Sequence, residues 1–175
     1  FTILSSCASR QLEEVTFRRT VIPVQELLDT AGKYFKKSMK NRSERIELEI
    51  EPMEAKVIGD VNQLRFLLEN LIDEALTVRE DGVIRLQARK DNEYIRFLFT
   101  DTRREKSVEE LNQLFYPNLA RMTSGEKGEL RGTEYLICKQ IIRDHDEFAG
   151  RRGCRINAEP AEGGGFTVYF TIPRR

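Results

Sequence analysis

Alternating apolar and polar residues predict several β-strands in this chain. Five segments carry an apolar side chain at every second position: residues 46–50, 84–88, 95–99, 154–158 and 166–172. This period is typical of a strand with one buried and one solvent-facing side. A short polar turn containing Asp91 and Asn92 separates the second segment from the third. We therefore expect these two strands to form an antiparallel hairpin.

Apolar residues at intervals of three and four predict helices between the strands. Four segments show this spacing: residues 23–35, 60–75, 108–115 and 134–143. Asp60 can cap the second helix, and Pro117 stops the third. Helices and antiparallel strands in this order predict an α+β fold. We expect a two-layer sandwich whose mixed, mostly antiparallel sheet is covered on one face by helices.

Charge balance and the lack of long apolar runs exclude several classes of protein. The 175 residues include 29 Lys+Arg and 29 Asp+Glu. The net charge is therefore zero, and it gives no indication of a nucleic-acid partner. No apolar run approaches the roughly 20 residues that span a bilayer, so we expect no membrane contact within this chain. Three widely separated cysteines, Cys7, Cys138 and Cys154, favour reduced thiols and a cytoplasmic location. Because Phe1 stands in place of Met, we interpret the chain as a piece of a longer protein, such as the cytoplasmic part of a membrane-anchored sensor.

Five blocks of sequence follow one another in a recognisable order. They are GDVNQLRFLLENLIDEAL (59–76), FLFTD (97–101), LNQLFYPNL (111–119), GTEYLICKQII (132–142) and GGGFTVYFTIP (163–173). Together these blocks resemble the ATP-binding domain of sensor histidine kinases, which has the Bergerat fold shared with gyrase and certain chaperone ATPases. The resemblance implies that residues 21–175 form a histidine-kinase ATPase-like domain. It also implies that residues 1–20 form an N-terminal arm at the fringe of an upstream dimerisation hairpin.

The resemblance implies where Mg-ATP would be held. Asp101 matches the aspartate that reads adenine in the family, and Asn70 matches the first asparagine of the helix block. Glu74 stands at the metal-holding position, where the family has asparagine, and Asp73 lies beside it. Oxygen ligands suit Mg²⁺, so Asn70 and Glu74 are the metal ligands that the resemblance predicts.

Charged residues replace glycines at positions where the family lets the main chain approach the nucleotide. In the family pattern D-x-G-x-G, Arg103 and Glu105 replace both glycines. In the second glycine block Gly132 remains, but Glu134 replaces the next glycine. Glu134 therefore places an anion where phosphates would meet a helix N-terminus. We expect these substitutions to impair ATP binding.

The last strand carries one further position of the predicted site. Counting back from Ile172 and Pro173 places Phe166 where the family has a small hydroxyl residue that contacts adenine. A shift of one residue would place Thr167 there instead.

Basic residues in the loops leave an alternative open, because they could hold phosphates by charge. These residues are Arg103, Arg104, Lys127 and Arg131. Glu105, Glu126 and Glu129 balance them locally, so we favour the interpretation that all four are ordinary solvated loop charges.

His145, the only histidine, invites a phosphoacceptor role. It follows the last predicted helix, and we assign it a capping or turn role. The resemblance supports this assignment, since the phosphoaccepting histidine of the family lies on a separate upstream hairpin.

Two functions remain open at this point. The one we favour is a regulatory or protein-interaction module that holds no cofactor. It would dock onto upstream dimerisation and phosphoacceptor helices or onto another signalling protein. The alternative is an active Mg-ATP-binding domain that phosphorylates a histidine on an upstream or partner domain. No Ser/His/Asp set, metal cluster or pair of general acids indicates another enzyme class.

Overall fold

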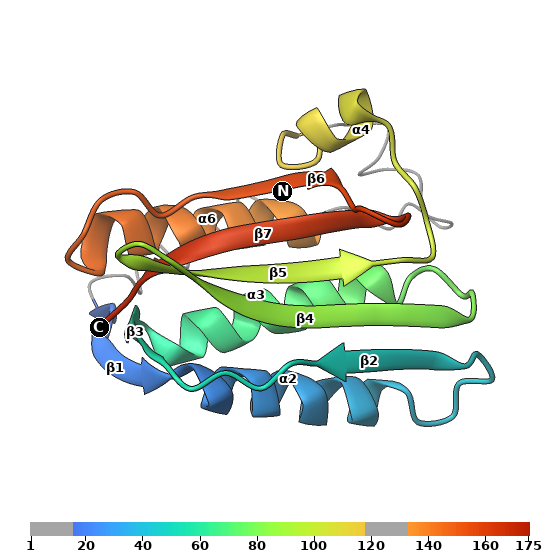
Figure 1. Cartoon of the computed structure of the whole chain (residues 1–175), viewed down its shortest axis with the longest axis horizontal. Helices are drawn as coiled ribbons and strands as arrows, with labels where there is room; N and C mark the ends of the chain where they lie inside the picture. The colour runs from blue at the N-terminus through green and yellow to red at the C-terminus, as the bar shows by residue number, and fades with distance from the viewer. Residues whose placement is uncertain (1–15, 118–132) are drawn as a thin grey trace.

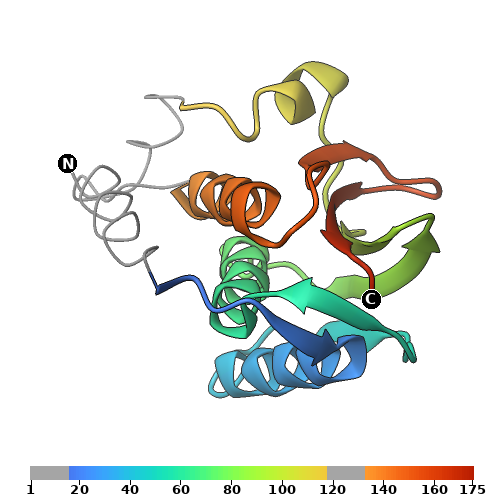
Figure 2. The ribbon, with the colours of Figure 1, turned by 90° about the vertical axis from the view of Figure 1, so that its left-hand side faces the viewer.

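The chain forms a helical layer on one face of a five-stranded sheet, as the computed structural model shows for residues 16–117 and 133–175 (Figure 1 and Figure 2). The helices of these residues are α2 (Val24–Ser38), α3 (Val61–Ala75), α4 (Val108–Asn112) and α6 (Thr133–Phe148). The strands are β1 (Thr20–Pro23), β2 (Ile46–Ile50), β3 (Lys56–Gly59), β4 (Gly82–Asp91), β5 (Tyr94–Asp101), β6 (Ile156–Pro160) and β7 (Phe166–Pro173).

The main sheet has the strand order β2-β4-β5-β7-β6. β2 runs parallel to β4, and the other neighbouring strands are antiparallel. The predicted α+β fold with a mixed, mostly antiparallel sheet is therefore confirmed, as is the hairpin of β4 and β5. β1 and β3 form a separate two-stranded antiparallel sheet, and Arg174 continues beyond β7 to form a bridge with Val57.

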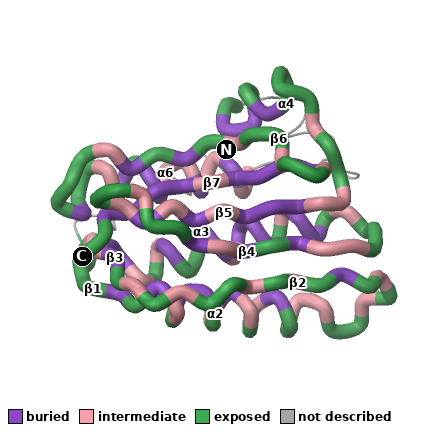
Figure 3. Tube along the Cα trace, in the orientation of Figure 1, coloured by how far each residue is buried: buried purple, intermediate pink, exposed green. Residues whose placement is uncertain are grey.

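The hydrophobic core lies between the sheet and the helices α2, α3 and α6 (Figure 2 and Figure 3). Alternate residues of β5, Ile95, Phe97 and Phe99, point into it, and the Phe97 ring stacks on Phe170 of β7 at a centroid distance of 4.9 Å. Each helix contributes an apolar stripe at the predicted spacing. Burial of these stripes fixes the helices against the sheet.

The N-terminus of α3 is held by two side chains from different parts of the chain. The Asp60 carboxylate accepts hydrogen bonds from the backbone N–H groups of Asn62 and Gln63, which confirms its predicted capping role. His145 is fully buried, and its Nε2 accepts from the backbone N–H of Asp60 at 3.0 Å while its Nδ1 donates to the Ile141 carbonyl at 2.9 Å. His145 thus joins α6 to the first turn of α3.

The predicted end of the last helix was wrong. α6 continues to Phe148, so His145 lies inside the helix and not in a turn after it. Asp144 and His145 are both buried in the last turns of this helix. Gly150, which has φ +97°, follows the true end.

Two sequence predictions concern the membrane and the N-terminal arm. Among the described residues, no helix combines the length and the apolar character needed to cross a bilayer. β1 begins at Thr20, the last residue of the predicted arm, and residues 1–15 lie outside the described part of the chain. The assignment of residues 1–20 to the fringe of a dimerisation hairpin stays a prediction.

Candidate functional site

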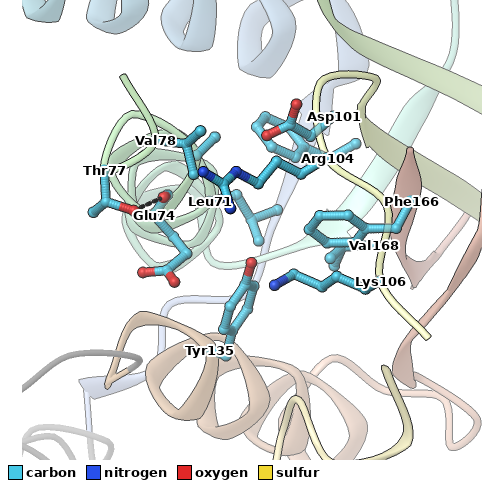
Figure 4. Close-up of a pocket in the computed structure, with 12 residues that line it drawn as sticks. Leu71, Glu74, Thr77, Val78, Asp101, Arg104, Lys106, Tyr135, Phe166 and Val168 are labelled. Atoms are coloured by element: carbon cyan, nitrogen blue, oxygen red, sulfur yellow. Dashed lines mark hydrogen bonds between the residues drawn. The ribbon is translucent and has the colours of Figure 1, made fainter. Parts of the chain in front are cut away.

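A small cavity lies beside Asp101, between α3, α6 and the ends of β5 and β7 (Figure 4). Its volume is about 50 Å³, which is room for a few water molecules. Pockets that take drug-sized ligands begin at about 300 Å³. Apolar and charged side chains line it together, among them Leu71, Glu74, Phe99, Arg104, Lys106, Tyr135, Phe166 and Val168.

The Asp101 carboxylate is bound by Arg103, two residues further along the chain. Nε of Arg103 donates to Oδ1 of Asp101 at 2.9 Å, and Nη2 donates to Oδ2 at 2.9 Å. The backbone N–H of Arg103 donates to Oδ1 as well, at 3.0 Å. Only 1% of the Arg103 side chain and 6% of the Asp101 side chain are exposed to solvent. The two groups therefore form a buried, bidentate ion pair.

The remaining donors of the Arg103 guanidinium are used by backbone carbonyls beyond and within the last turn of α3. Nη2 donates to Ala75 at 2.6 Å, and Nη1 donates to Val78 at 2.9 Å and to Glu80 at 3.0 Å. A cation is favoured at a helix C-terminus, where carbonyls lack intrahelical partners. Arg103 thus joins the end of β5 to the end of α3.

Two glycines leave the space that this arrangement needs. A Cβ atom at Gly82 would lie 2.5 Å from Cγ of Arg103. A Cβ atom at Gly165 would lie 2.1 Å from the Asp101 carbonyl oxygen, and Gly165 has φ +83°. The main chain before β7 therefore lies directly against the Asp101–Thr102 backbone.

Of the predicted residues on α3, only Glu74 lines the cavity. The side-chain amide of Asn70 is buried and donates to the Phe66 carbonyl at 2.7 Å. Asp73 lies on the other side of α3, where its carboxylate accepts from the Tyr34 hydroxyl at 2.6 Å. That contact and burial raise the pKa of Tyr34 above its usual range, with burial the larger cause. Within residues 16–117 and 133–175, no three His, Cys, Asp or Glu side chains gather in a way that could hold a metal ion.

On β7, Phe166 faces the cavity (Figure 4), and Thr167 is not among the residues that line it. Phe166 pairs with Asp101 and Thr167 pairs with Thr100 in the register of β5 and β7. The Thr167 hydroxyl lies 2.7 Å from the Thr100 hydroxyl, on the opposite side of the sheet. Which of Phe166 and Thr167 matches the hydroxyl position of the family stays a prediction.

The loop charges have different environments. Arg104 is 57% exposed and pairs with Glu80, as expected of a solvated charge. For Arg103 that expectation was wrong, because its side chain is buried on Asp101. Glu105 is exposed, and Glu134 lies in the first turn of α6 without lining the cavity. Gly132, Lys127, Arg131, Glu126 and Glu129 lie outside the described residues.

Lys106 and Tyr135 are among the cavity residues that were missed in the sequence. Lys106 lies 5.4 Å from the Phe166 ring centroid, and its side chain extends towards Tyr135 (Figure 4). The position of Lys106 in the loop after Asp101 was a usable signal. Tyr135 gave no such signal, and its burial on α6 is known only from the structure.

Comparison of the chain with known protein families gives a match. Residues 59–175 match the family described as histidine kinase-, DNA gyrase B-, and HSP90-like ATPase. No curated protein sequence matches the chain.

Solved structures of similar fold include histidine kinases. The catalytic domain of histidine kinase ThkA, in a nucleotide-free form, is 22% identical, with a TM-score of 0.70 over 90% of this chain and 96% of that one. A mycobacterial sensor histidine kinase, MprB, is 20% identical, with a TM-score of 0.68 over 90% and 99%. ThkA in complex with response regulator protein TrrA is 19% identical, with a TM-score of 0.70 over 99% of this chain and 48% of that chain.

Proposed function

Since the chain belongs to the family of histidine kinase-, DNA gyrase B- and HSP90-like ATPases, we propose that it is the ATPase-like domain of a two-component signalling protein of the sensor histidine kinase type. In this proposal ATP binding is impaired, and the domain acts as a regulatory or protein-interaction module. The observation that carries the proposal is the buried pair of Arg103 and Asp101.

The residues beside Asp101 fit adenine poorly. An aspartate that reads adenine must accept a hydrogen bond from the base, but three of the about four acceptor positions of the Asp101 carboxylate are already used, by Nε, Nη2 and the backbone N–H of Arg103. Clearing the guanidinium from the carboxylate would also break its hydrogen bonds to the carbonyls of Ala75 and Val78. A buried ion pair that loses one partner costs about 3–5 kcal/mol. Binding of a nucleotide would have to offset that cost.

The metal-binding part of the site fits Mg-ATP poorly as well. The predicted ligands Asn70 and Glu74 are on α3, but only Glu74 faces the cavity. Its carboxylate adds a negative charge beside any polyphosphate that entered. The cavity of about 50 Å³ is also far smaller than a nucleotide requires. We therefore assign no step of phosphoryl transfer to this site.

A module of this kind works through its partner. ThkA was solved in complex with the response regulator TrrA, and we infer that this chain contacts a protein of the same signalling class. The upstream dimerisation and phosphoacceptor helices, or another signalling protein, are the proposed partners. We propose that the domain is cytoplasmic, the location in which two-component signalling proteins contact one another.

Nucleotide binding tests the proposal directly. Mg-ADP and Mg-ATP are titrated into the chain by calorimetry, and thermal unfolding is followed with the same nucleotides. A ligand at 100 times its Kd stabilises the native state by about 2.7 kcal/mol. We expect neither heat of binding nor a rise in Tm, while an active histidine kinase domain measured alongside shows both.

The Asp101→Asn variant identifies the site of any binding that is seen. Mg-ATP binding that the wild-type chain shows and this variant loses would contradict the proposal. That outcome would favour the alternative, an active catalytic domain that phosphorylates a histidine on an upstream or partner domain. Incorporation of labelled phosphate by a longer chain with its upstream segment would then be the confirming measurement.

A further inference from the structure

A second, larger hollow lies at the opposite end of the sheet from Asp101. It has a volume of about 340 Å³ and lies between β1, β3, the end of α6 and the end of β7. Tyr94 pairs with Pro173 at this end of β5, whereas Asp101 pairs with Phe166 at the other. The eight-residue strand separates the two ends by roughly 25 Å. We call this hollow the arginine pocket, because Arg19, Arg151 and Arg174 line it.

Two of the three arginines have no acidic partner. Arg151 pairs with Glu93. Within residues 16–117 and 133–175, Arg19 and Arg174 form no ion pair, and their side chains donate no hydrogen bond to these residues. The guanidinium of Arg19 lies against Gly150, where a Cβ atom would come within 2.6 Å of its Nη1. Guanidinium groups that form no ion pair and donate no hydrogen bond are available to bind an anion.

The rest of the lining is mostly apolar. Val21 of β1 lies opposite Ile58 of β3, and Ala149 and Pro173 complete the apolar part. Val21 is 43% exposed, although it is a large apolar side chain. A few convergent charged groups around an apolar surface are typical of a site for a small organic anion.

Groups that oppose an anion are also present. Glu93 lies at the rim with Arg151, and the C-terminus of α6 directs its partial negative charge towards this region. Three guanidinium groups against one carboxylate still leave an excess of two positive charges. This excess matches the two negative charges of a phosphate monoester near neutral pH.

We propose that the arginine pocket binds a phosphate monoester through Arg19, Arg151 and Arg174, with the apolar body of the ligand against Val21, Ile58 and Pro173. Phosphate suits this set better than carboxylate. Each guanidinium presents a fork of N–H donors, and three such forks exceed what the two oxygens of one carboxylate can accept. The site is separate from the Asp101 cavity and does not depend on the function proposed there.

Phenyl phosphate is the probe for this proposal, titrated into the full 175-residue chain by calorimetry. We expect saturable binding that the Arg19→Ala/Arg174→Ala double variant weakens by at least about tenfold. Arg85→Ala is the matched control, since Arg85 is an exposed arginine paired with Glu49 on the main sheet. This control should bind as the wild type does. Unchanged melting temperatures establish that both variants are folded.

Two further probes distinguish the sources of the phosphate. Inorganic phosphate tests whether the anion alone suffices, and co-sedimentation with phosphatidic acid vesicles tests a lipid headgroup. Binding of phenyl phosphate without co-sedimentation supports a soluble ligand, and co-sedimentation that the double variant loses supports a lipid. No saturable binding of any probe, or equal binding by the double variant and the wild type, would overturn the proposal.

Discussion

The two ends of the main sheet use arginine in opposite ways. At the Asp101 end, Arg103 is buried and its Nε, Nη1 and Nη2 donors all bind acceptors of the same chain. At the other end, Arg19 and Arg174 are exposed beside a hollow of about 340 Å³, without an acidic partner among the described residues.

This difference shows that a residue type does not by itself indicate a binding site. Both ends carry arginine near positions where an anion could be expected. Only the acceptors around each guanidinium decide whether it holds a ligand or holds the fold together.

Arg103→Ala should have the largest effect on stability. It leaves the buried Asp101 carboxylate without its cation and removes a hydrogen-bond donor from each of three backbone carbonyls. We expect the free energy of unfolding to fall by about 3–5 kcal/mol, measured by urea denaturation. Arg104→Ala is the control, because its exposed pair with Glu80 should contribute about 0–1 kcal/mol. Similar losses in the two variants would remove the contrast.

Gly165→Ala should come next. Gly163 and Gly165 both have positive φ, but a Cβ atom at Gly163 meets no atom within 4 Å, whereas one at Gly165 meets the Asp101 carbonyl oxygen. We expect Gly163→Ala to cost about 1–2 kcal/mol from backbone conformation alone. Gly165→Ala should cost about 1–3 kcal/mol more because of the contact. Equal unfolding midpoints for the two variants would show that the backbone beside Asp101 yields easily.

Cys154 allows a test of pH dependence at the end of the main sheet opposite Asp101. Burial, with a smaller contribution from the charge of Asp146, raises the pKa of the Cys154 thiol to about 12. Its contribution to stability should therefore be complete below the usual value of 9.0, and it should be lost as the pH rises from there towards about 12.

Alkylation measures this directly. At pH 9 we expect Cys154 in the native protein to react with iodoacetamide at least about a hundredfold more slowly than in urea. Mass spectrometry of the peptide that contains Cys154 gives the rate. Rapid modification of the native protein at that pH would mean that this region opens to solvent.

Arg19→Ala and Arg174→Ala should have the smallest effects. Exposed side chains without partners contribute within about 0.5 kcal/mol of zero to stability. Urea denaturation of each variant should therefore match the wild type. A loss comparable with that of Arg103→Ala would show that these arginines support the fold and are not available to a ligand.

Local patterns were enough to predict most of the fold. The alternation of Ile95, Phe97 and Phe99 identified β5, and Asp60 marked the start of α3, because both signals lie within a few residues of the element they define. The environment of Arg103 could not be predicted in this way. Its carbonyl partners on and after α3 are 23 to 28 positions distant in the chain, so no local pattern connects them.

The same distinction between local signals and distant partners applies to the site residues. The position of Asp101 at a strand end followed from alternation alone. Whether Phe166 or Thr167 faces the cavity depended on the pairing of β7 with β5, which one sequence does not determine to a single residue. Asp73 shares α3 with Glu74, but the helical turn directs it to Tyr34.

The contact between Gly59 and His145 limits how this chain can diverge. A methyl group on residue 59 would lie 2.8 Å from the imidazole ring, so a side chain there and a histidine at 145 exclude each other. In homologous chains the two positions should therefore covary: where the glycine is replaced, the histidine should be replaced by a smaller residue.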